Sequence, residues 1–241
     1  MSIILDVLLL VIVLFCALHA SARTVYRTVA NLLILLVVFA GSVLGTFALR
    51  PLVQSVFTEP YYARIVAADL AERVSSPELD DPYLTVANID IPALMDKPSA
   101  QLEQELTETY NVTPQAVLDS TAGLTGKEAS DTALKAIVTP ISRDMAKAIA
   151  YVVLFLLLLI LLKIIGKRIY EKRALNTKTT RNTGLSFGLG AVVGLLWCYT
   201  LVATMVKCFY PYQFGALSLL GLHSGVDGSF LMKYLILFNP F

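Results

Sequence analysis

Four long apolar runs divide the chain, and each is close to the length that crosses a membrane. They have 20, 21, 18 and 23 residues and lie at 3–22, 29–49, 148–165 and 184–206. A hydrocarbon core about 30 Å thick needs about 20 helical residues, and at these lengths only a helix satisfies its own backbone hydrogen bonds in lipid. The pattern predicts an all-α membrane protein whose four transmembrane helices form two hairpins, at 1–50 and 146–206.

The first run also ends like a secretory signal peptide. Ala20, Ser21 and Ala22 have the small-x-small form of a cleavage site. A signal peptide carries its positive residues before the apolar stretch, whereas here none precedes the run and Arg23 and Arg27 follow it. We therefore expect the first run to be retained as a transmembrane helix.

Lysine and arginine gather in the two short loops that join the helices of each hairpin. Nine lie there: Arg23, Arg27, Lys163, Lys167, Arg168, Lys172, Arg173, Lys178 and Arg181. Near the opposite ends of the runs are six: Arg50, Arg64, Lys135, Arg143, Lys147 and Lys207. Because short loops rich in lysine and arginine stay in the cytoplasm, both loops, including 163–183, are expected inside the cell. Both termini and the middle region are then extracytoplasmic.

The middle region, 51–145, differs in composition from the rest of the chain. It contains fifteen acidic and six basic residues, a net charge of −9. Apolar residues recur at helical spacing within 62–74, and Leu102, Leu106 and Tyr110 repeat every four residues. Both patterns are typical of amphipathic helices, so we expect a small helical insertion outside the membrane.

Capping and turn signals subdivide this region. Thr113 supplies a capping side chain and Pro114 suits the first helical position, so a third short helix is expected through about Leu118. The stretch 75–96 is rich in turn-forming and acidic residues. That composition predicts loops.

The tail, 207–241, is apolar but is interrupted by a proline and four glycines, so no further membrane-spanning helix fits. Its last part, 229–241, suits a short helix that lies in the membrane interface. Tyr210, Tyr212 and Tyr234 would anchor this tail at the level of the lipid headgroups.

The composition restricts the kinds of ligand and activity expected for this chain. With 56% hydrophobic and 15% charged residues the chain has too little polar surface for a soluble monomer, and a net charge of +1 gives no bias towards nucleic acid. Three cysteines (Cys16, Cys198 and Cys208) lie in or beside apolar runs and do not form a disulfide framework. His19 and His223 are isolated, with neither metal-ligand spacing nor a serine elbow nearby. We expect no metal, no cofactor and no enzymatic activity.

Asp6 is an ionisable residue inside the first apolar run, one turn from its outer end. Such a group costs about 2.5–3.5 kcal/mol at the centre of a transmembrane helix and less towards the end. One interpretation is a carboxylate that reaches the interface and favours the helix dipole. The alternatives are a hydrogen bond to another helix, or a place on an ion path.

Small residues cluster in the second and fourth runs, where glycines four residues apart share one helix face. Such faces let helix backbones approach closely. The pairs are Gly41 with Gly45, Gly184 with Gly188, and Gly190 with Gly194. We expect packing between the two hairpins, with the first pair facing the last, and self-association is the alternative.

Several local features together resemble the colicin V production protein family of bacterial inner-membrane proteins. They are Asp6 in the first run, Leu175-Asn176 in the basic segment, the glycine-rich stretch 184–194 and the ending Phe238-Asn239-Pro240-Phe241. The long acidic middle region and the segment 23–27, where many members have glycine, depart from the family pattern.

The resemblance implies a multi-pass protein of the bacterial cytoplasmic membrane linked to toxin or bacteriocin production and envelope physiology. It implies no catalytic residues. The first hypothesis is a non-enzymatic component that assists production or export through membrane partners. The second is a small transporter or channel subunit, although the predicted spans contain only Asp6, His19, Asn31, Ser42 and a few further hydroxyls as polar groups.

Overall fold

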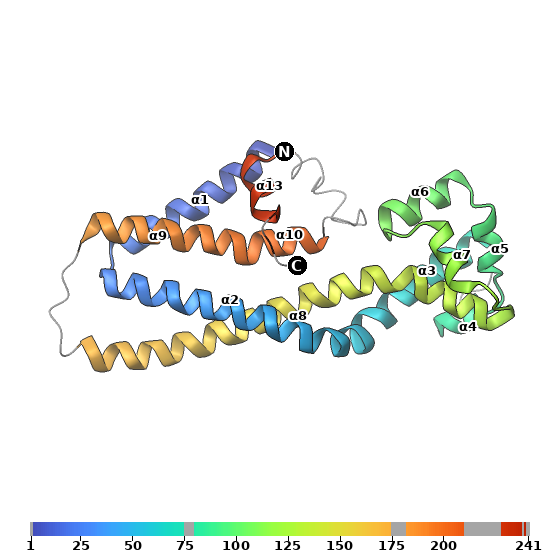
Figure 1. The fold of residues 1–241 in the computed structure, drawn as a ribbon, viewed down its shortest axis with the longest axis horizontal. Coiled ribbons are helices and arrows are strands. Elements are labelled where there is room, and N and C mark those ends of the chain that lie inside the picture. Colours follow the sequence, from blue (N-terminus) through green and yellow to red (C-terminus); the bar gives the residue numbers. More distant parts are fainter. Residues whose placement is uncertain (1, 75–79, 175–181, 210–227, 238, 240–241) are drawn as a thin grey trace. The chain divides into compact units, whose positions relative to one another are not determined.

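The computed structural model describes the chain except residues 1, 75–79, 175–181, 210–227, 238 and 240–241 (Figure 1). Every regular element in the described part is helical, as predicted, and none is a strand. The chain divides into two compact units. The apolar unit comprises Met1–Ala48, Ala148–Cys208 and Leu220–Phe241, and the acidic unit is built mainly from Leu49–Lys147.

The apolar unit contains the four predicted spans and the last helix. Its elements are α1 (Ser2–Ser21), the first part of α2 (Val25–Val53), the second part of α8 (Gly126–Ala174), α9 (Thr183–Trp197), the π-helical turn η2 (Cys198–Ala203), α10 (Thr204–Phe209) and α13 (Phe230–Leu237). Helix α8 runs unbroken for 49 residues, so the predicted third span is only a segment of it.

Aromatic rings fill the centre of the apolar unit. Tyr151 and Phe155 of α8 are fully buried beside Leu35 and Val38 of α2. The Phe155 ring meets the Trp197 ring edge to face, with centroids 5.5 Å apart. Edge-to-face contacts of this kind stabilise beyond the area they bury, so α2, α8 and α9 share one core.

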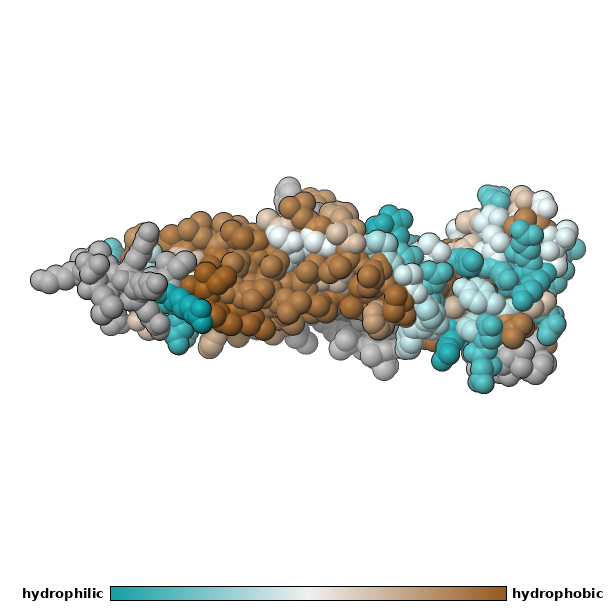
Figure 2. Space-filling model, turned by 90° about the horizontal axis from the view of Figure 1, so that it is seen from below, coloured by the Kyte–Doolittle hydropathy of each residue, from teal (hydrophilic) through white to brown (hydrophobic). Residues whose placement is uncertain are grey.

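The outer surface of the apolar unit is hydrophobic. Phe15 of α1 is 69% exposed and Phe47 of α2 is 58% exposed. Brown, hydrophobic side chains cover a large continuous part of the surface in Figure 2. Soluble monomers rarely expose continuous apolar patches above a few hundred Å², so this surface indicates contact with a lipid bilayer.

Among the described residues, three continuous helical runs are long and apolar enough to cross a membrane. They are Val25–Val74, Gly126–Arg168 and Thr183–Ala203. The apolar run found in α1, Asp6–Ser21, is shorter. The structure therefore supports a multi-pass membrane protein and shows three of the four predicted spans by length and composition.

The closest helix pairs join segments that are far apart in the sequence. Helix α1 lies along α9, and α2 packs on α8 through the shared core (Figure 1). The predicted hairpins would instead pair α1 with α2 and α8 with α9 as nearest neighbours. Chain order alone does not select helix partners. The small side chains of α1 and α9 allow these two helices to approach each other more closely than the adjacent helices in the sequence would allow.

The acidic unit is a bundle of short helices closed by two long ones. It contains η1 (Gln54–Thr58), α3 (Glu59–Val74), α4 (Pro82–Val86), α5 (Ile91–Asp96), α6 (Ala100–Thr109), α7 (Pro114–Thr121) and the start of α8. The helices predicted within 62–74, at 102–110 and from Pro114 are confirmed as α3, α6 and α7.

The expectation of loops throughout 75–96 is wrong for its second half, which forms α4 and α5. Asp81 accepts a hydrogen bond from the Tyr83 backbone N–H at 2.9 Å, and Asp90 accepts one from Ala93 at 3.0 Å. The acids and prolines that resemble loop signals are therefore helix caps and first-turn residues.

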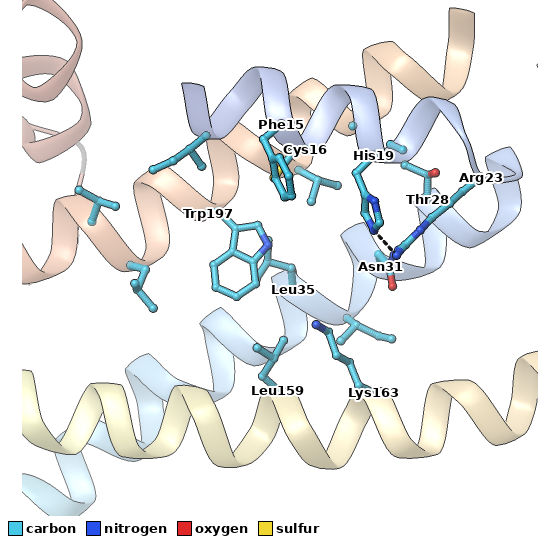
Figure 3. A pocket seen from close by; sticks show the side chains of 17 residues that line it. Phe15, Cys16, His19, Arg23, Thr28, Asn31, Leu35, Leu159, Lys163 and Trp197 are labelled. Atoms are coloured by element: carbon cyan, nitrogen blue, oxygen red, sulfur yellow. Dashed lines mark hydrogen bonds between the residues drawn. The ribbon is translucent and has the colours of Figure 1, made fainter. Parts of the chain in front are cut away.

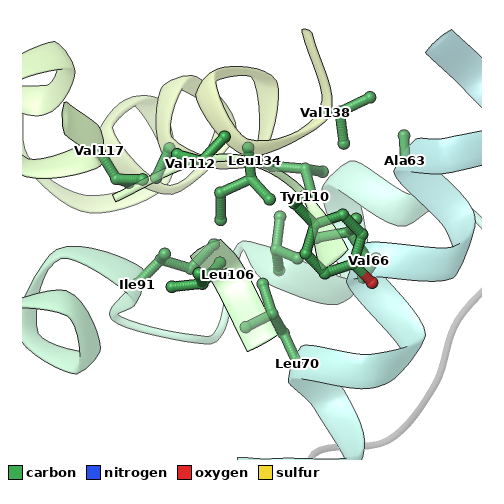
Figure 4. Packing of buried hydrophobic residues seen from close by; sticks show 14 of the residues in the cluster. Ala63, Val66, Leu70, Ile91, Leu106, Tyr110, Val112, Val117, Leu134 and Val138 are labelled. Carbon is green, nitrogen blue, oxygen red and sulfur yellow. The ribbon is translucent and has the colours of Figure 1, made fainter. Parts of the chain in front are cut away.

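The acidic unit has its own hydrophobic core (Figure 4). Val66 and Leu70 of α3 meet Leu106 of α6 and Leu134 of α8, and all four are buried. Burial raises the pKa of Tyr110, at the edge of this core, to about 12. Arg73 of α3 forms one ion pair with Asp69 in its own helix and another with Glu105, which joins α3 to α6.

Candidate functional site

Asp6 joins α1 to the first turn of α13. Its carboxylate accepts a hydrogen bond from Ser229 Oγ at 2.6 Å and from the backbone N–H groups of Phe230 and Leu231, each at 3.1 Å. Ser229 Oγ in turn accepts from the Met232 backbone N–H at 3.0 Å. These are the unpaired donors of a helix N-terminus, so Asp6 caps α13 from another helix. Of the three interpretations of Asp6, the geometry fits the hydrogen bond between helices.

Asp6→Leu is expected to lower the melting temperature of the protein in detergent, because it removes the acceptor of three hydrogen bonds to Ser229, Phe230 and Leu231. Asp6→Asn retains one acceptor oxygen and should lower it about half as much. Thermal unfolding of the purified variants measures both. Unchanged stability in Asp6→Leu would mean that Asp6 only lies at a solvated helix end. Loss of function in both variants, with normal stability, would instead indicate that Asp6 lies on an ion path.

A π-helical turn, η2, interrupts the fourth predicted span. Tyr151 Oη donates to the Thr200 carbonyl at 2.5 Å. Asn239 Nδ2 donates to the Tyr199 carbonyl in this turn at 3.5 Å and to Thr204 Oγ1, the first residue of α10, at 2.8 Å. π-Turns leave backbone groups misaligned with the α-helical ladder and often mark functional sites. Side chains from α8 and the tail meet the polar groups of this segment, which sequence reasoning did not find.

The glycine faces pack against partners other than those expected. A Cβ atom on Gly190 would clash with the Ala20 Cβ, and one on Gly194 would lie 2.7 Å from the Val13 Cα. Both partners belong to α1. Gly41 and Gly45 instead face side chains of α8. The expected contact between the two glycine pairs is therefore not what the structure shows.

Gly184 and Gly188 differ from the other glycines. Both are exposed, and a Cβ on Gly188 would meet nothing within 4 Å. Within the part of the chain that the structure describes, they do not form a close helix contact.

A cavity of about 470 Å³ lies among α1, α2, α8 and α9 in the apolar unit. Figure 3 shows His19, Arg23 and Asn31 together at one end, and Lys163 pointing into the cavity between them and Leu159. The other end is lined by apolar and aromatic side chains, among them Phe15, Leu35, Leu159 and Trp197. The cavity is thus amphipathic, with a cationic end and a hydrophobic end.

Two contacts position Arg23. Its guanidinium donates to His19 Nε2 one helical turn earlier, which requires that ring nitrogen to be unprotonated. Ser186 of α9 is buried and donates to the Arg23 carbonyl at 3.2 Å. A second cavity of about 270 Å³ shares Arg23 and Lys163 with the first and adds Arg27 and Lys167 to its walls.

The described part of the chain holds no group of three or more His, Cys, Asp or Glu residues able to bind a metal ion. Cys16 and Cys198 are both free thiols. Several sequence features lie outside the described residues, namely Leu175-Asn176, Cys208 as a side chain, Tyr210, Tyr212, His223, Phe238, Pro240 and Phe241. Tyr234, by contrast, is exposed on α13.

Comparisons with models of known protein families, with curated proteins and with solved structures found no match to this chain.

Proposed function

We propose that the chain is a non-enzymatic, multi-pass protein of the bacterial cytoplasmic membrane that presents a folded acidic module on the extracytoplasmic side. The observation that carries this proposal is the division into a unit with a hydrophobic exterior and a unit with a separate, closed core and hydrophilic side chains on its surface (Figure 2). These two units suit a membrane anchor joined to a docking module better than they suit a catalyst.

In this proposal α1 is a fourth transmembrane helix that is retained in the protein. Ala17 and Ala20 of α1 are buried, and Gly190 and Gly194 of α9 lie against the α1 backbone. Cleavage after Ala22 would remove the helix that covers this face. Intact-mass measurement of the purified protein should therefore show the first 22 residues present, apart from the initiating methionine. A mature form starting at Arg23 would contradict four spans.

Membrane topology is tested with single cysteines in a variant that lacks the three native ones. Asp80→Cys and Arg168→Cys place a thiol at exposed positions in the acidic unit and at the basic end of α8. An impermeant thiol reagent should label intact cells only at position 80, because short basic loops stay in the cytoplasm. Labelling of both after cell disruption is the control. Labelling at 168 alone in intact cells would invert the topology.

The resemblance to the colicin V production protein family supports a role in producing or exporting a toxin or bacteriocin through membrane partners. Cross-linking in intact membranes, followed by purification of the chain, should recover a specific partner, and deletion of the gene should reduce toxin release. Recovery of the chain alone, together with normal release, would contradict this role. Cross-linked copies of the chain itself would instead indicate self-association.

A small transporter or channel subunit is the second candidate, and the amphipathic cavity favours it. Two of the polar residues of the predicted spans, His19 and Asn31, line that cavity. However, Asp6 is bonded to α13 and Ser42 donates to the Val38 carbonyl at 2.6 Å. Neither Asp6 nor Ser42 is among the residues that line the cavity. Ion or solute flux into vesicles containing the purified protein would favour transport over the anchor role.

A further inference from the structure

We propose that the amphipathic cavity of the apolar unit binds one anionic phospholipid, with its phosphate at Arg23 and Lys163 and one acyl chain along Trp197 and Leu159. This inference rests on the membrane location given under Proposed function. It assigns a ligand class to residues that have no role in the anchoring argument. The shared chemistry is a phosphate ester that carries an apolar chain.

The cationic end comes from three separate elements. Arg23 follows α1 and is positioned by His19 and Ser186, whereas Lys163 extends from α8 into the cavity (Figure 3). Asn31 of α2 adds a side-chain amide beside them. An arginine fork and a lysine ammonium that line the same cavities suit a phosphate group.

The electrostatic balance of the two adjoining cavities favours an anion. Arg27 and Lys167 extend the cationic wall in the smaller cavity. Among the residues described as lining either cavity there is no aspartate or glutamate. A lipid headgroup that carries its own cation would place like charges together, so zwitterionic lipids are disfavoured.

The apolar end and the membrane level favour a lipid over a free phosphate ion. Beyond the basic residues the cavity continues between Phe15, Leu35, Leu159 and Trp197. Its volume of about 470 Å³ is in the usual range for small-molecule sites. Basic residues at the cytoplasmic ends of transmembrane helices lie at headgroup level, and basic pockets between such helices bind anionic lipid headgroups.

The ligand class is tested on the purified, delipidated full chain by thermal unfolding in detergent. Phosphatidylglycerol should raise the melting temperature in a saturable way, whereas phosphatidylcholine with the same acyl chains and inorganic phosphate should not. Equal stabilisation by the two lipids would overturn recognition of an anion. Equal stabilisation by inorganic phosphate would overturn the acyl-chain part of the site.

The residues are tested by titrating phosphatidylglycerol and counting bound lipid by native mass spectrometry. Lys163→Gln should raise the apparent Kd about tenfold, as expected for loss of one charge-assisted hydrogen bond. Arg23→Gln should do the same if it still folds, which circular dichroism and gel filtration check. Arg168→Gln is the matched control, because Arg168 is an exposed residue of α8 that lines neither cavity.

An equal loss of affinity in Arg168→Gln and Lys163→Gln would show only general attraction of basic residues to anionic lipid, and would overturn the site. The location assumption is checked separately, since cell fractionation reports whether the chain is in the membrane. A chain that fractionates with membranes yet binds phosphatidylglycerol no better than phosphatidylcholine contradicts the lipid site and leaves the proposed function standing.

Discussion

Gly190→Leu is expected to separate α1 from α9 and to remove most of the stability of the apolar unit. A Cβ at this position would clash with the Ala20 Cβ and would lie 2.8 Å from both the Ala17 Cα and the Cys16 carbonyl oxygen. Two of these atoms are backbone, so no side-chain rotation relieves the clash. Overpacking of a close contact typically costs about 1–3 kcal/mol, and leucine adds three further carbons to the one that already clashes.

A pair of alanine variants isolates the packing effect. Gly190→Ala and Gly188→Ala are the same chemical change two residues apart on α9, but a Cβ on Gly188 would meet nothing within 4 Å. Alanine is favoured over glycine within helices by about 1 kcal/mol. Gly188→Ala should therefore match or exceed the native melting temperature in detergent, whereas Gly190→Ala should fall below it.

Equal melting temperatures for the two alanine variants would mean that α1 does not lie against Gly190. Self-association makes a different prediction. If Gly190→Leu retains native stability but loses a cross-linkable dimer, the glycine face contacts a second copy. Only a loss of monomer stability supports the contact between α1 and α9.

Leu106→Ala is expected to destabilise the acidic unit by about 3 kcal/mol, because a large-to-small change in a packed core costs about 2–5 kcal/mol. Leu106 is 2% exposed and packs on residues of α3 and α8 within that unit (Figure 4). Limited proteolysis of the full chain in membranes should then cut Leu49–Lys147 faster, while helices of the apolar unit stay protected by lipid.

Leu84→Ala is the control for this prediction, because Leu84 of α4 is 47% exposed. It removes the same atoms from the surface of the same unit, so its effect should be below 0.5 kcal/mol, as for surface substitutions generally. Equal sensitivity of the two variants would contradict the core seen around Leu106. Simultaneous exposure of the apolar unit in Leu106→Ala would show that the two units unfold together.

Local patterns predicted the helices well where one physical signal dominated. The four-residue repeat of Leu102, Leu106 and Tyr110 identified the buried face of α6, and Thr113 with Pro114 identified the start of α7. The stretch around Asp81 and Asp90 was wrongly predicted to be loop, because helix caps and turns use the same residue types. Whether an acid caps a helix depends on whether the following segment finds a core to pack on.

For the candidate sites, the sequence pointed to single residues but not to their partners. Asp6 and Asn31 are noticeable as polar residues in apolar runs, and Arg23 is noticeable as a basic residue after one. Their partners come from other elements: Asp6 bonds to Ser229, 223 positions away, and Arg23 shares its cavity with Lys163. No short-range pattern encodes such pairs, because they depend on which helices become neighbours.

The sequence by itself determined that this chain is helical, that it meets lipid and that an acidic region separates its apolar runs. Hydrophobic length and charge distribution are enough for those conclusions, because the transfer of apolar surface and of charge depends mainly on residue type. Only the tertiary structure decided that α1 packs on α9, that Asp6 caps α13 and that a cationic cavity opens between the helices. In lipid, helix partners are selected by close packing and directional hydrogen bonds, and these depend on positions in three dimensions.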